Sequence, residues 1–165
     1  MNRRDIVIGF IILAVVAGII YFVRRPQTTP IEIPIATPSF EEQFENKFNT
    51  QIPENLEKSE LKNITGQGGS GLATRNFENG TFSLTVLADL PDLESNNFYE
   101  AWLSRGTVGQ SNYSLISIGR LQIAKGGFLL DFTVNKDYSD YQEVIVSVES
   151  KLGNSPEKII LEGSF

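Results

Sequence analysis

The sequence predicts an all-β fold, an antiparallel Ig-like β-sandwich of about seven strands, preceded by a single N-terminal transmembrane helix and a short amphipathic helix. Three observations lead to this prediction. An unbroken apolar run occupies residues 6–23, phenylalanines recur every four residues over residues 40–48, and from Gly71 onward apolar and polar residues alternate. A long apolar run is typical of a membrane span, a repeat near 3.6 indicates a helix, and a repeat of two indicates strands.

The apolar run is long enough to cross a bilayer as a helix. At a rise of about 1.5 Å per residue, residues 6–23 extend over nearly the hydrocarbon thickness of a membrane. A cleaved signal peptide would have a shorter run followed by small residues, whereas Tyr21, Phe22 and Val23 lead here into two arginines. We therefore expect a permanent anchor in the cell membrane. Its membrane-anchoring residues include Ile6, Phe10, Val16, Ile20 and Val23.

The orientation of this anchor is decided by the segment that follows it. Arginine pairs lie on both sides of the apolar run, so the comparison of flanking positive charges is close to a tie. Residues 24–38 are rich in proline and threonine, which is typical of an extended stalk that holds a domain away from a surface. We therefore expect a single-pass protein in which residues 1–5 form a cytoplasmic tail and the C-terminal domain is extracytoplasmic.

Residues 39–61 are predicted to form a short helical segment. Ser39 lies three residues before Glu42, which is the pattern of a capping box at a helix start. Pro53 is expected to end this helix, and the residues after it to form another helical turn. One face of the helix carries Phe40, Phe44 and Phe48. This stripe either packs against the domain or the membrane interface, or docks another membrane protein.

Residues 62–165 are predicted to form the β-sandwich. Alternating apolar residues, or short apolar runs, indicate strands at residues 81–87, 98–103, 115–123, 128–132, 144–148 and 159–162. Turn signals separate several of them, including Asn79-Gly80 and Gly126-Gly127. Large apolar side chains on such strands are most simply core residues, and the predicted structural core includes Tyr99, Trp102, Leu103, Phe132 and Val146.

Composition excludes several classes of function. The chain has 20 acidic residues against 14 basic ones, so nucleic acid is a poor partner. It has no cysteine and no histidine, which removes thiolate chemistry, disulfides and the commonest general base and transition-metal ligand. We therefore predict that the protein is not an enzyme and has no cofactor, and no catalytic, cofactor-binding or metal-ligating residue is assigned.

Two sequence clusters resemble ligand sites without matching them. The glycine-rich stretch of residues 66–71 looks like a phosphate cradle, but a strand pattern follows it and no lysine is present, so a flexible turn is favoured. An acidic cluster is formed by Asp131, Asp137, Asp140 and Glu143. Its spacing matches no EF-hand loop, so a solvated acidic turn is the default, and calcium binding by residues 137–143 stays an open alternative.

Five motifs in the second half of the chain resemble a known family. They are Leu90-Pro91-Asp92-Leu93, Phe98-Tyr99-Glu100-Ala101-Trp102-Leu103, Gly119-Arg120-Leu121, Val146-Ser147-Val148-Glu149 and Asn154-Ser155-Pro156. In their order and spacing over residues 70–165, they resemble the extracytoplasmic C-terminal domain of anti-sigma-K factors. The resemblance implies an anchored β-sandwich outside the membrane of a bacterial envelope.

The same resemblance shapes the expected function. Members of that family hold their sigma factor with a cytoplasmic helical domain ahead of the membrane span, and this chain is expected to lack that sigma-binding domain. We therefore expect an accessory of anti-sigma-factor type, which acts in envelope sensing or regulation through a partner. The alternative is a structural or adhesive cell-surface module without a signalling role. Expected partners are the lipid bilayer and another membrane or envelope protein.

Overall fold

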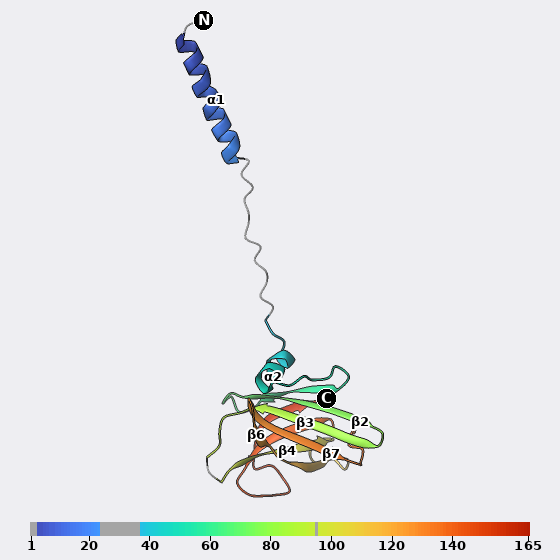
Figure 1. Ribbon diagram of the computed structural model, residues 1–165. Helices are drawn as coiled ribbons and strands as arrows, with labels where there is room; N and C mark the ends of the chain where they lie inside the picture. The colour runs from blue at the N-terminus through green and yellow to red at the C-terminus, as the bar shows by residue number, and fades with distance from the viewer. Residues whose placement is uncertain (1–2, 24–36, 95) are drawn as a thin grey trace. The chain divides into compact units, whose positions relative to one another are not determined.

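The computed structural model describes residues 3–23, 37–94 and 96–165, and it divides into two units at residue 36 (Figure 1). The first unit contains helix α1, Arg3–Val23. Side chains of α1 are described at Ile11 and at residues 13–22, and all of these are exposed. Among the described residues, no helix is both long enough and apolar enough to cross a membrane.

Several of the expectations for the N-terminal region fall outside this description. Of the five predicted anchor residues, Val16 and Ile20 are each 49% exposed. The side chains of Ile6, Phe10 and Val23 lie outside the described part of the chain, as do residues 1–2 of the tail and residues 24–36 of the stalk. The predicted membrane span, stalk and topology therefore stay predictions.

The predicted amphipathic helix is confirmed as α2, Phe40–Phe48. Its capping box is formed in both directions, because Glu42 N–H donates to Ser39 Oγ (3.1 Å) and Ser39 N–H donates to Glu42 Oε2 (2.7 Å). Asn49 ends the helix in the left-handed conformation, with φ at 54°. The helix starts where its capping box predicts, but it ends at Phe48, before the Pro53 that was expected to end it.

The second unit is built mainly from antiparallel β-structure, as predicted, with nine strands. They are β1 Glu57–Asn63, β2 Ser70–Glu78, β3 Thr81–Asp89, β4 Phe98–Arg105, β5 Ser114–Arg120, β6 Gln122–Ala124, β7 Gly127–Val134, β8 Glu143–Glu149 and β9 Lys158–Ser164. The strands follow each other in the order β5-β4-β8-β9-β1-β2-β3-β7-β6, with every pairing antiparallel.

This arrangement corrects both the predicted Ig-like sandwich of about seven strands and the predicted helical segment of residues 39–61. All nine strands are hydrogen-bonded neighbours in one sheet that nearly closes on itself, rather than two separate stacked sheets. In addition, residues 57–61 form the first part of β1, although they were expected to be helical. Ser59 and Leu61 are buried while Glu60 between them is exposed, which is the period of a strand, and pairing with β2 stabilises it.

The sheet approaches closure where the chain passes from β5 to β6. These strands lie at the two ends of the sheet order, yet only Leu121 separates them in sequence. Leu121 is buried, and its N–H donates to the carbonyl oxygen of Tyr99 (2.9 Å). The run predicted as one strand over residues 115–123 is therefore two strands, which pair with β4 and β7 respectively.

The apolar core fills the inside of this curved sheet. Of the predicted core residues, Tyr99, Leu103 and Val146 are buried in it and Phe132 packs against it half-buried. Trp102 is also buried, but it alternates with Ala101 and Leu103 and therefore lies on the opposite face of β4.

A second, smaller apolar cluster joins α2 to the sheet. Phe44 and Phe48 are 4% and 8% exposed and pack with Ile52 and with Leu72 of β2 and Leu87 of β3. Phe40 is half-buried at the edge of this cluster, and its ring lies 5.0 Å from that of Phe44. The phenylalanine stripe therefore packs against the domain, which is one of the alternatives predicted for it.

Candidate binding pocket

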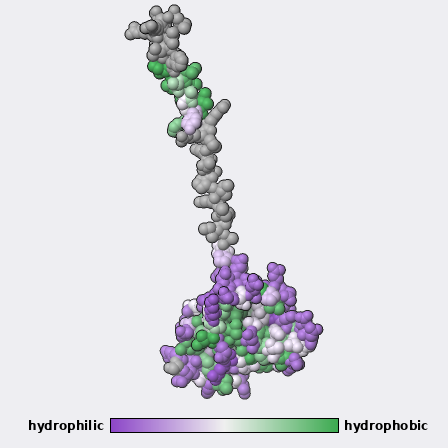
Figure 2. Space-filling model, in the orientation of Figure 1, coloured by the Kyte–Doolittle hydropathy of each residue, from purple (hydrophilic) through white to green (hydrophobic). Residues whose placement is uncertain are grey.

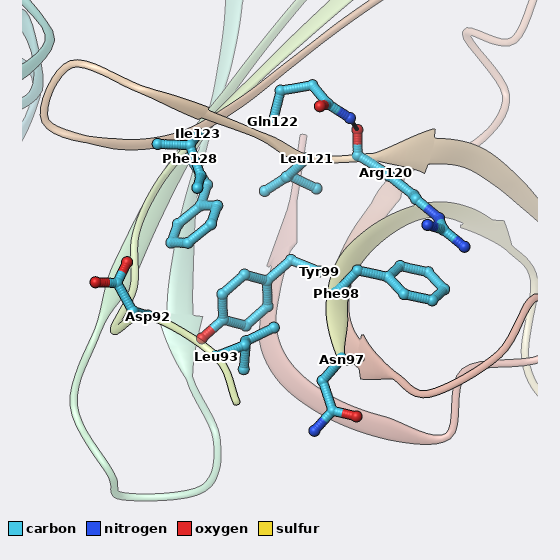
Figure 3. A pocket seen from close by; sticks show the side chains of 10 residues that line it. All are labelled: Asp92, Leu93, Asn97, Phe98, Tyr99, Arg120, Leu121, Gln122, Ile123 and Phe128. Carbon is cyan, nitrogen blue, oxygen red and sulfur yellow. Dashed lines mark hydrogen bonds between the residues drawn. The ribbon is translucent and has the colours of Figure 1, made fainter. Parts of the chain in front are cut away.

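A cavity of about 460 Å³ lies beside the β5–β6 corner, where the sheet approaches closure. It is built from the loop before β4, the start of β4, the corner itself and the start of β7 (Figure 3). Its lining residues are Asp92, Leu93, Asn97, Phe98, Tyr99, Arg120, Leu121, Gln122, Ile123 and Phe128. Residues from three separate parts of the chain therefore meet in one pocket.

Two aromatic rings form the middle of this pocket. Tyr99 is buried, and its ring meets that of Phe128 edge to face at a centroid distance of 4.8 Å and an interplanar angle of 74°. The hydroxyl of Tyr99 donates to the carbonyl oxygen of Pro91 (2.9 Å), which ties the loop before β4 to the sheet. Both rings are held by the core, so this part of the pocket is preformed.

Arg120 supplies a positive charge at the rim of the pocket, where its side chain and that of Phe98 point away from the Tyr99 ring (Figure 3). Its Cζ lies 3.5 Å from the centroid of the Phe98 ring, so the guanidinium stacks on that ring. Within the described residues, the guanidinium makes no ion pair and donates no hydrogen bond; only its backbone oxygen is engaged, by Gln122 Nε2 at 3.4 Å. A stacked guanidinium keeps its donors free for a planar acceptor such as a carboxylate.

Asp92 supplies a negative charge on the other side. Figure 3 shows its carboxylate and the guanidinium of Arg120 on opposite sides of the Tyr99 ring. Asp92 is exposed and is in no ion pair or hydrogen bond with the described residues. Its charge acts on the pocket, since the pKa of Tyr99 is raised mainly by burial and further by Asp92.

The raised pKa of Tyr99 leads to a pH-dependent prediction. The folded domain keeps this phenol neutral at a pH where the unfolded chain ionises it. Its contribution to stability is therefore complete below the ordinary tyrosine pKa of about 10 and is lost as the pH rises from that value through the folded-state pKa. We expect Tyr99→Phe to reduce the loss of stability at alkaline pH, in denaturant unfolding measured over a pH series. Tyr113→Phe, outside the pocket, is the matched control and should leave the alkaline loss unchanged.

A buried polar network lies on the outer face of β4 and β8. Ser147 Oγ accepts from Trp102 Nε1 (2.8 Å) and donates to Glu149 Oε1 (2.5 Å), while Ser117 Oγ donates to Glu100 Oε1. The Oε2 atoms of Glu100 and Glu149 have no hydrogen-bond partner among the described residues. Because the two glutamates are 2% and 0% exposed, they cannot reach a substrate. The Ser117–Glu100 bond links β5 with β4, and the Trp102–Ser147 bond links β4 with β8.

The other predicted clusters do not assemble into a site. Within the described residues, no group of three or more His, Cys, Asp or Glu side chains could hold a metal ion. Of the acidic cluster, Asp131 accepts from the hydroxyl of Thr85 (2.7 Å), whereas Asp140 pairs with Arg105. Residues 66–69 connect β1 to β2 as a turn, with positive φ at three of its glycines.

The pocket was not anticipated as a site from the sequence. Asp92, Phe98 and Arg120 belong to motifs that resemble a family, Tyr99 is also a predicted core residue, and Phe128 lies in a predicted strand. One sequence signal bears on it: Gly119-Arg120-Leu121 interrupts the alternation, and this interruption is the corner that lines the pocket. Comparison of the chain with protein-family models, curated proteins and solved structures finds no match.

Proposed function

We propose that the protein is a membrane-anchored binding module whose extracytoplasmic β-domain acts as an accessory in envelope sensing or regulation. The observation that carries this proposal is the pocket beside the β5–β6 corner, where two opposite charges have no partner within the described chain. A preformed apolar pocket with a few unpaired charged groups at its margin is typical of a ligand-binding site.

Anchoring is supported by the character of the N-terminal residues. The apolar run of residues 6–23 falls within helix α1, and apolar side chains described there are highly exposed, for example Leu13 at 69% and Phe22 at 75%. Figure 2 shows this apolar surface on α1, whereas the visible side of the domain carries polar and apolar areas side by side. An exposed apolar stretch of this kind calls for lipid or a partner helix.

A binding role is favoured over catalysis by the composition of the pocket. Asp92 is the only carboxylate among its lining residues, and the only hydroxyl, that of Tyr99, is engaged by Pro91. Among the described residues that line the cavity, there is neither a nucleophile–base pair nor a pair of carboxylates. The resemblance to the anti-sigma-K C-terminal domain supports the regulatory form of this role, with a structural or adhesive module as the second candidate.

The proposal is tested by cross-linking in native membranes. Full-length protein is cross-linked and captured, and its partners are compared with those of Arg120→Gln and of Lys125→Gln, which removes an exposed positive charge outside the pocket. We expect one specific membrane protein to be captured by the wild type and by Lys125→Gln and to be lost with Arg120→Gln. Capture of envelope polymer alone would instead favour the adhesive module.

Topology is tested in the same cells. Protease added to intact cells is expected to remove the β-domain, because the domain is proposed to face outward. Full protection of the domain, in cells whose other surface proteins are digested, would place it inside and would contradict the proposed location.

A further inference from the structure

We propose that the pocket binds a short peptide through both of its free ends, with the terminal carboxylate on Arg120 and the terminal ammonium on Asp92. This inference rests on the proposed binding role of the pocket and names its ligand class. It starts from the two charges. A purely anionic ligand would be attracted by Arg120 and repelled by Asp92. A purely cationic ligand would be attracted by Asp92 and repelled by Arg120. A zwitterion can pair with both charges.

The geometry of Arg120 favours a carboxylate. Stacking on Phe98 fixes the plane of the guanidinium, and none of its N–H groups has an acceptor in the described chain. A planar guanidinium presents paired donors that match the two oxygens of a carboxylate. Asp92 offers the complementary acceptor for an ammonium group on the far side of the Tyr99 ring (Figure 3).

The floor of the pocket is apolar, and two amide side chains lie at its margin. Tyr99, Leu121 and Phe128 are buried or nearly so and form the floor. Asn97 and Gln122 line the same cavity and carry both amide donors and acceptors, which suit the N–H and C=O groups of a peptide bond. A cavity of about 460 Å³ is within the size range of small-ligand sites.

The position of the pocket at the end of the sheet favours a peptide over other zwitterions. Strand β6, Gln122–Ala124, is the last strand in the sheet order and pairs on one side only, with β7. The side chain of Ile123 in this strand is 82% exposed. An unpaired strand edge offers main-chain hydrogen bonds to an extended peptide, and an exposed apolar side chain beside it adds contact area.

The test is a calorimetric titration of the full-length protein in detergent micelles. The probes are leucine, leucyl-leucine and trileucine, followed by the N-acetyl and C-amide forms of the best binder. We expect acetylation and amidation each to weaken binding by about tenfold or more, since each removes a charge-assisted hydrogen bond. The length that binds best reports the span between the two charges, because each added residue lengthens an extended peptide by roughly 3.3–3.6 Å.

Two variants assign each end of the peptide to its residue. Asp92→Asn is expected to lower the affinity for the free peptide and to make the affinities for the free and the N-acetylated peptide equal. Arg120→Gln is expected to lower the affinity for the free peptide and to make the affinities for the free and the C-amidated peptide equal. Lys125→Gln, which lies outside the pocket, should bind like the wild type. Circular dichroism of each variant confirms that the β-domain is folded before its titration is compared.

Three outcomes would overturn the inference. They are no binding of any probe, equal binding of free and blocked peptides, and equal binding by wild type and both pocket variants. If no peptide binds but the cross-link to a membrane protein still depends on Arg120, the ligand class is wrong and the binding role of the pocket stands. If no peptide binds and the cross-link does not depend on Arg120, the proposed binding role of the pocket is also wrong.

Discussion

Replacement of Trp102 by alanine is expected to lower the free energy of unfolding of the β-domain by about 3–5 kcal/mol. The indole is 1% exposed, so its removal leaves a cavity between neighbours that relax only partly. The substitution also removes the donor to Ser147 Oγ, the group that hydrogen-bonds the buried Glu149. A buried polar network that loses a member leaves the remaining groups less well satisfied.

The measurement is denaturant unfolding of the full chain followed by circular dichroism. Trp102 is the only tryptophan, so its fluorescence serves for the wild type but not for the variant. Trp102→Phe fills most of the volume of the indole but lacks its N–H group, so its free energy of unfolding should lie between those of the wild type and Trp102→Ala. Val108→Ala, at a residue that is 77% exposed, is the control and should change stability by less than about 0.5 kcal/mol. If Trp102→Ala unfolded at the same midpoint as this control, the network would carry no stability.

Serine at both Phe44 and Phe48 is expected to release α2 from the sheet and to lower stability by several kcal/mol. Each ring is buried, and truncating a buried phenylalanine to a small residue costs about 3–5 kcal/mol when the site cannot close. The double variant also exposes Leu72 and Leu87, which the helix covers. Hydrogen exchange should show loss of protection over residues 40–48, and the denaturation midpoint should fall.

If the phenylalanine stripe docked another membrane protein, the same variant would be expected to abolish that contact while the domain stayed intact. Because both rings pack inside the domain, loss of contact in this double variant would not separate docking from detachment of the helix. Phe40→Ser is the better test of docking, since Phe40 is only half-buried. If the double variant kept its stability and its hydrogen-exchange protection, the packing of α2 on the sheet would be contradicted.

The elements that the sequence predicts best are those set by local chemistry. The capping box of Ser39 and Glu42 places the start of α2 because both hydrogen bonds are formed within four residues. The turn at Asn79-Gly80 places the β2–β3 hairpin because both residues adopt positive φ there. Such local signals depend only on residues close in sequence, so they determine the same local structure in different tertiary folds.

The features that the sequence does not predict depend on distant partners. Residues 57–61 carry alternating charges compatible with a helix, and their strand conformation follows from pairing with β2. Arg120 and Asp92 look like ordinary surface charges until the β5–β6 corner brings them to one cavity. The sheet order has the same origin, since β1 and β9 lie at opposite ends of the domain sequence yet pair with each other.

The pairing of β9 bears on when the domain can fold. β9 lies between β8 and β1, and without it the strands form two separate groups, β5-β4-β8 and β1-β2-β3-β7-β6. A nascent chain that has not yet been synthesised through residue 164 therefore lacks the strand that unites them. The nearly closed sheet can be completed only after β9 has left the ribosome, so a chain exported during synthesis would cross the translocon before its sheet is complete.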